Sequence, residues 1–124
     1  MARKPVNLEI VSDAVAALDD PEGPSKPQQR DAVRALLSLL ARRAPGKTVE
    51  VRVPPYGAVQ CVAGPRHTRG TPPNVVETDP VTFLKLAAGR VTFSDALAEG
   101  AISASGTRAD LTDYLPLLER GALM

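Results

Sequence analysis

A chain of 124 residues has room for one domain with one apolar core. Its 15 basic residues nearly balance its 14 acidic residues, and it has two tyrosines, two phenylalanines and no tryptophan. This balance argues against a nucleic-acid-binding protein, and the few aromatic rings offer little surface for base stacking. The single cysteine, Cys61, excludes an intrachain disulfide. This fits a reducing cytoplasm, where we expect the protein to lie. We expect no signal peptide and no membrane span, because polar residues interrupt the apolar run from Val6 to Leu18.

The first quarter of the chain predicts two helices joined by a linker. Apolar residues at helical spacing, from Leu8 to Leu18, predict a helix over residues 7–19. Residues 22–27 are rich in proline, glycine and serine, which is typical of a mobile linker. Val33, Leu36, Leu37 and Leu40 then form the clearest apolar stripe, in a helix over residues 28–43. We therefore expect an N-terminal helix and linker (1–27), followed by a single domain (28–120).

The middle of the chain predicts three strands. Residues 48–53 alternate between valines and charged side chains, which indicates a half-buried strand. A turn at 54–57 leads to a second strand over residues 58–63, and the two form a hairpin. Residues 64–73 have the composition of a loop, and residues 74–78 form a third strand.

Residues 79–120 predict helices with clear start and stop signals. Asp79 is a good N-cap, Pro80 suits the first helical position, and Gly89 ends the helix. Thr92 to Asp95 is a capping-box pattern that begins a short second helix ending at Gly100. A short strand follows over residues 101–105, and a last helix spans 108–120, with Pro116 expected to kink or break it. Four strands and about four helices predict an α+β two-layer domain.

The order of these last elements also carries a family resemblance. The run D-P-x-x-F-x-x-L-x-x-G, a helix with an Ala-Leu-Ala core and a G-x-I-x-x-x-G strand resemble the sterol carrier protein type 2 family. The likeness is greatest to its small actinobacterial orthologs and covers roughly residues 28–119. It implies a curved, mostly antiparallel sheet of four to five strands, helices over one face and an apolar cavity between the layers.

The resemblance further implies non-enzymatic binding or carriage of a lipid, such as a fatty acyl chain, an acyl-CoA or a sterol-like molecule, with no cofactor. On periodicity alone the apolar stripes are typical of core packing. Given the resemblance, nine of their residues are the expected lining of a lipid cavity: Leu36, Leu40, Phe83, Leu84, Phe93, Leu97, Leu111, Leu115 and Leu118. The alternative is a structural or protein-interaction module with the same fold and a filled core.

One loop segment stands out by its charge. Arg66, His67 and Arg69 lie within four residues of one another. Because a guanidinium presents a planar fork of donors, these residues could bind an anion such as a lipid headgroup. The alternative is structural: the arginines would pair with Glu77 or Asp79 and fix the loop.

Catalysis and metal binding have weaker support in the sequence. Cys61 and His67 could form a thiol nucleophile and its base, but a cysteine on the apolar side of a strand is usually a small buried hydrophobe. One histidine and one cysteine without ligand spacing do not predict a zinc site. We therefore expect no metal and no enzymatic activity.

Overall fold

The computed structural model describes residues 5–64 and 74–118. Its helices are α1 (Leu8–Ala16), α2 (Lys26–Arg43), α3 (Pro80–Ala87) and α4 (Phe93–Ala98), and its strands are β1 (Val49–Val53), β2 (Gly57–Cys61), β3 (Asn74–Thr78) and β4 (Ile102–Ser105). Two short 3-10 helices, Ala17–Asp19 and Thr112–Tyr114, complete the described elements. None of the helices in this part of the chain is long and apolar enough to cross a membrane.

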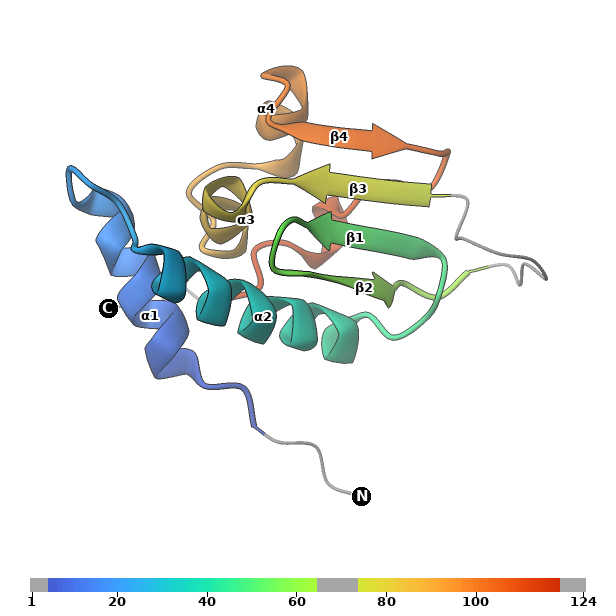
Figure 1. Cartoon of the computed structure of the whole chain (residues 1–124). Helices are drawn as coiled ribbons and strands as arrows, with labels where there is room; N and C mark the ends of the chain where they lie inside the picture. Colours follow the sequence, from blue (N-terminus) through green and yellow to red (C-terminus); the bar gives the residue numbers. More distant parts are fainter. Residues whose placement is uncertain (1–4, 65–73, 119–124) are drawn as a thin grey trace.

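The four strands form one mixed sheet in the order β2-β1-β3-β4 (Figure 1). β1 pairs antiparallel with β2 and parallel with β3, and β3 pairs antiparallel with β4. The parallel pair arises because β3 does not follow β2 in the sheet but lies on the other side of β1. The predicted α+β class is confirmed.

The core lies between the inward face of this sheet and the helices. Val49, Val51 and Val53 are fully buried, whereas Glu50 and Arg52, which point to the opposite face, are partly exposed. The apolar stripe predicted for α2 is buried as well. The alternation of the strand and the periodicity of the helix therefore meet in one apolar layer.

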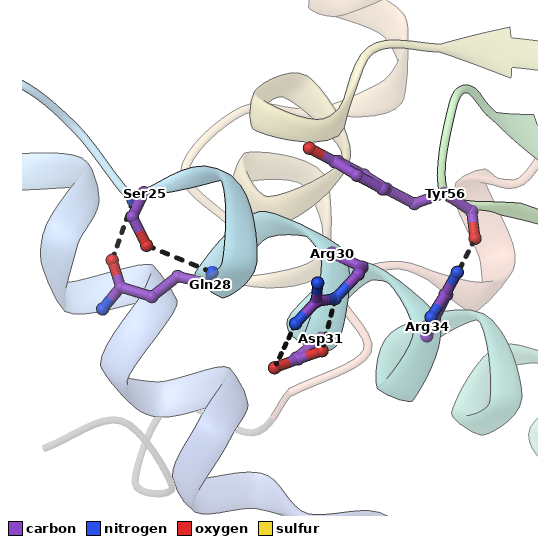
Figure 2. Close-up of polar contacts among 6 residues, drawn as sticks. All are labelled: Ser25, Gln28, Arg30, Asp31, Arg34 and Tyr56. Atoms are coloured by element: carbon purple, nitrogen blue, oxygen red, sulfur yellow. Dashed lines mark hydrogen bonds and ion pairs between the residues drawn. The ribbon is translucent and has the colours of Figure 1, made fainter.

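A reciprocal cap fixes the start of α2 (Figure 2). The Ser25 hydroxyl accepts a hydrogen bond from the Gln28 amide at 3.2 Å, and the Gln28 side chain accepts one from the Ser25 amide at 2.8 Å. Pro27 fits within the first turn, where a helix does not need its N–H. The helix consequently starts at Lys26, two residues before the start predicted from the apolar stripe.

α1 packs against α2 and contributes Val11, Ala14 and Val15 to the core. The 3-10 turn that follows it is held by an ion pair. Arg90 donates to both carboxylate oxygens of Asp19, at 2.6 and 3.0 Å. This pairing lowers the pKa of Asp19, chiefly through the hydrogen bond. The N-terminal helix is thereby joined to the turn between α3 and α4.

The prediction of a last helix over 108–120 is wrong within the described residues. Only Thr112–Tyr114 forms a turn of 3-10 helix, and Leu115 is extended, with φ −114° and ψ 145°. Pro116 is the cause, because a proline disfavours helical geometry at the residue before it and cannot donate a helical hydrogen bond. Asp110 accepts bonds from the backbone and hydroxyl of Thr112 instead of starting a longer helix.

A buried asparagine at the start of β3 bonds to two segments that are distant in the sequence. Asn74 is 3% exposed; its side-chain amide donates to the Thr48 carbonyl at 3.0 Å and its carbonyl accepts from the Arg108 amide at 2.9 Å. The first bond ties β3 to the residue before β1. The second ties it to the segment after β4.

Replacing Asn74 by alanine should lower the free energy of unfolding by about 2 kcal/mol, because it leaves the buried Thr48 carbonyl without its partner. Urea unfolding followed by circular dichroism measures the change. Ser103→Ala is the matched control, since Ser103 is exposed on the same sheet and should change stability by less than about 0.5 kcal/mol. Equal effects of the two substitutions would contradict the role given to Asn74.

Candidate apolar binding site

An apolar pocket of about 330 Å³ lies where α3 ends, α4 begins and the C-terminal segment passes. We call it the α3/α4 pocket. Its lining comes from three stretches of the chain: Leu86, Ala88, Gly89, Val91, Thr92, Phe93, Thr112, Leu115, Pro116 and Leu118. None of these ten residues is ionisable, and only the two threonines have polar side chains. The side chains that line the pocket are thus mostly apolar.

The nine residues expected to line a cavity are not all in one place. Phe93, Leu115 and Leu118 line the α3/α4 pocket. Leu97 is 43% exposed on α4. The other five are buried at 2% exposure or less in the core and do not line this pocket: Leu36, Leu40, Phe83, Leu84 and Leu111.

The end of α3 forms one wall of the pocket. The Asp79 carboxylate accepts hydrogen bonds from the Thr82 amide at 3.0 Å and its hydroxyl at 2.6 Å, so the predicted N-cap is confirmed. At the other end, Gly89 has φ +76°, a conformation that side chains rarely adopt. A β-carbon at Gly89 would stand 3.4 Å from ring carbons of Pro116. That distance is an ordinary contact, so it is the positive φ, with which the chain turns out of α3, that favours glycine here.

The C-terminal segment forms the opposite wall and is held by backbone hydrogen bonds. The Ala87 carbonyl accepts from the amides of Leu117 at 3.0 Å and Leu118 at 3.1 Å. These bonds satisfy a carbonyl at the helix end, where no intrahelical donor remains. The Arg43 guanidinium, at the end of α2, donates to the Leu117 carbonyl. Leu117 itself is fully buried and anchors the segment.

Two hydroxyls give the pocket its polar character. Thr92 caps α4, and its hydroxyl oxygen accepts from the Asp95 amide at 3.0 Å. A hydroxyl that accepts one bond can still donate another, so Thr92 can serve a carbonyl or carboxylate of a ligand. The Thr112 hydroxyl donates to Asp110 at 2.5 Å and can still accept.

Sequence reasoning missed most of the lining. Leu86, Val91 and Pro116 are absent from the predicted lining, because their positions next to helix-ending residues give no signal beyond a turn. Thr92 and Thr112 likewise indicate only hydrogen bonds to residues nearby in the sequence, and not a place in a pocket. The capping patterns correctly place the ends of α3 and α4, and those ends are where the pocket forms. A search for apolar residues beside helix stops would have found part of it.

The predicted anion-binding residues Arg66, His67 and Arg69 lie outside the described residues, and their role stays a prediction. Of their proposed partners, Asp79 is engaged as the cap of α3. Glu77 is exposed on the outer face of β3, opposite Arg52 in the neighbouring strand. Among residues 5–64 and 74–118, no group of three or more His, Cys, Asp or Glu side chains could hold a metal ion.

Cys61 is fully buried at the end of β2. Burial raises the pKa of its thiol to about 11, because an apolar environment disfavours the charged thiolate. The thiolate is the reactive form, so a nucleophilic role for this cysteine has no support from its surroundings. The interpretation as a small buried hydrophobe fits the site better.

The Cys61 thiol should therefore react slowly in the folded protein. Labelling with a disulfide reagent at pH 8 should be at least about a hundredfold slower than in guanidinium chloride, from the raised pKa alone. Absorbance of the released thiolate measures the two rates. Comparable rates in the folded and unfolded protein would mean that Cys61 is accessible and ionised, which would contradict its burial.

Comparison with known proteins identifies a family. A family model described as "Bacterial SCP ortholog" matches residues 25–117, three quarters of the chain. The matched range runs from the N-cap of α2 to Leu117 and includes nine of the ten residues that line the α3/α4 pocket, all except Leu118. No curated protein matches the chain.

Proposed function

The chain belongs to the family of bacterial SCP orthologs, sterol-carrier-protein-like modules, and on this premise we propose that it binds a fatty acyl chain in the α3/α4 pocket. The single observation that carries the proposal is the lining: eight of the ten residues are apolar or glycine, and none is ionisable. Family membership supports a carrier-type module. The pocket supplies the place where a lipid would be held.

The size of the pocket favours a single acyl chain over a sterol. At roughly 30 Å³ for each water-sized group, about 330 Å³ holds about ten methylene-sized groups. A sterol, with its fused rings and side chain, is roughly twice as large and would have to displace the walls. We infer a chain of about eight to ten carbons, with its polar end near Thr92 and Thr112.

The expected affinity is weak. Burying about eight methylenes contributes roughly 6 kcal/mol at about 0.8 kcal/mol each. Association costs of at least about 4 kcal/mol offset much of this. The remainder of about 2 kcal/mol corresponds to a dissociation constant of tens of millimolar, and hydrogen bonds from the polar end to Thr92 and Thr112, at about 1 kcal/mol each, would bring it to the millimolar range.

The same lining argues for binding without chemistry. General acid–base and nucleophilic catalysis need an ionisable side chain or an activated nucleophile next to the substrate. The described lining offers only the hydroxyls of Thr92 and Thr112, and neither is hydrogen-bonded to a basic nitrogen among the described residues. This supports a non-enzymatic role.

A pocket-filling substitution tests the location. Ala88→Leu adds three carbons to the lining, roughly 90 Å³ of the pocket, and should weaken decanoate binding about tenfold or more in isothermal titration. Ala98→Leu is the matched control, because Ala98 is exposed on α4 and does not line the pocket. Thermal unfolding of both variants shows whether the fold is retained. Unchanged binding by a folded Ala88→Leu variant would place the lipid elsewhere.

A ligand series tests the chain length. Affinity should rise from hexanoate to decanoate by about 0.8 kcal/mol for each buried methylene and then level off through palmitate. Cholesterol should not compete with a bound fluorescent decanoate analogue. Tight cholesterol binding would contradict the size argument but remain consistent with a lipid carrier. If neither cholesterol nor any fatty acid of the series bound, the lipid function itself would be contradicted.

One observation favours the alternative of a protein-interaction module. A large cavity between the sheet and the helices would leave apolar side chains facing open space. Five of the residues expected there are instead packed at 2% exposure or less: Leu36, Leu40, Phe83, Leu84 and Leu111. The core between the layers is filled by the protein's own side chains. If the lipid series fails, this filled core supports a module that acts through its surface.

A further inference from the structure

A second hollow, unrelated to the α3/α4 pocket, lies between helix α2 and strand β2. Its volume is about 430 Å³. We call it the α2/β2 groove, and its lining is Arg34, Leu37, Ser38, Ala41, Arg42, Gly57, Ala58 and Val59. The two hollows share no lining residue. The groove can therefore be occupied whether or not the pocket holds a lipid.

Helix α2 and strand β2, which form the two sides of the groove, run side by side in the same direction (Figure 1). Near its start, the Arg34 Nε donates to the Tyr56 carbonyl at 3.2 Å, just before β2 (Figure 2). Near its end, the Val62 amide donates to the Ala44 carbonyl at 2.6 Å, just after α2. These two bonds, ten helical residues apart, hold the two sides of the groove together along its length.

The strand side of the groove is the edge of the sheet. β2 pairs with β1 and with no other strand among the described residues. Edge strands are usually protected by charged residues or proline, but the sequence of β2, GAVQC, has neither. Gly57, Ala58 and Gln60 are exposed, and Val59 is partly exposed. The side chains of β2 are therefore mostly small, uncharged and exposed, and α2 lies beside the strand.

The helix side carries positive charge at two points. Arg34 and Arg42 are eight residues apart on α2, which places them about 12 Å apart along the helix. No carboxylate among the described residues forms an ion pair with either of them; the neighbouring Asp31 pairs with Arg30 at 2.9 Å. Between them the groove is floored by Leu37, Ala41 and Val59.

This spacing corresponds to an extended chain. In a β-strand, residues i and i+4 point to the same side and lie about 13 Å apart, and residue i+2 points to that side between them. Two acidic side chains at i and i+4 would meet Arg34 and Arg42. A small apolar side chain at i+2 would lie over the apolar floor.

We propose that the α2/β2 groove binds an extended acidic segment of a partner protein, with acidic residues at i and i+4 and a small apolar residue at i+2. The acidic side chains pair with Arg34 and Arg42, and the segment lies along β2. Recognition of an extended peptide at a sheet edge is a common mode of protein binding. An anionic membrane fits less well, because the apolar floor lies in a hollow between two elements and not on a protruding surface.

The test uses the full chain and a fluorescein-labelled nonapeptide, Gly-Ser-Glu-Thr-Val-Thr-Glu-Ser-Gly, in fluorescence anisotropy. Arg34→Gln and Arg42→Gln should each weaken binding about tenfold, since each removes a charge-assisted hydrogen bond. Arg108→Gln removes the same charge from an exposed residue outside the groove and should leave binding within about twofold. Thermal unfolding of each variant confirms that the fold is intact.

Two control peptides and one lipid vesicle control complete the test. Replacing both glutamates by glutamine should abolish binding, and moving the second glutamate to i+3, on the opposite side of the strand, should weaken it about tenfold. An equal affinity for peptides with the second glutamate at i+3 and at i+4 would overturn the proposal. The proposal would also be overturned if the peptide did not bind while vesicles containing phosphatidylserine did, and if that vesicle binding depended on Arg34 and Arg42. The groove would then be assigned to an anionic membrane.

Discussion

The structure depends on one apolar core in which the inward face of β1 and the apolar stripe of α2 are buried together. Val49, Val51 and Val53 are fully buried on that face, and Val33, Leu36 and Leu40 are fully buried on the helix. Because β1 is central in the sheet, with β2 on one side and β3 on the other, this layer fixes both neighbours. From β3 the chain passes through α3 and α4 and returns as β4, which pairs antiparallel with β3.

This packed core determines where the two hollows described above lie. The space between the sheet and α2 is filled by the protein's own side chains, so the two hollows lie at its margins. The α3/α4 pocket forms where two helices end and a nonhelical segment crosses them. The α2/β2 groove forms where the helix lies beside the last strand of the sheet. One is apolar and the other carries two arginines, so they suit different partners.

Local sequence signals predicted the parts of the pocket that depend on local chemistry. The cap at Asp79, the stop at Gly89 and the cap at Thr92 are each decided by a side chain and the backbone groups within a few residues of it. Those signals placed α3 and α4 within one or two residues. They could not predict that the Ala87 carbonyl would bind the amides of Leu117 and Leu118, thirty residues later. These residues are separated in the sequence by α4 and β4, so the contact depends on how the whole chain folds.

The amino-acid sequence by itself determined the secondary structure of residues 5–64 and 74–105, the family and the α+β class, because each rests on periodicity, caps and the order of elements. It also contained the cause of the failed last helix, since Pro116 disrupts the residue before it whatever surrounds it. Only the tertiary structure decided which apolar residues line a pocket. Periodicity shows that Leu36 and Leu115 each lie on an apolar face, but whether that face meets another side chain or an open space depends on the elements packed against it. For Leu36 this is the filled core, and for Leu115 it is the α3/α4 pocket.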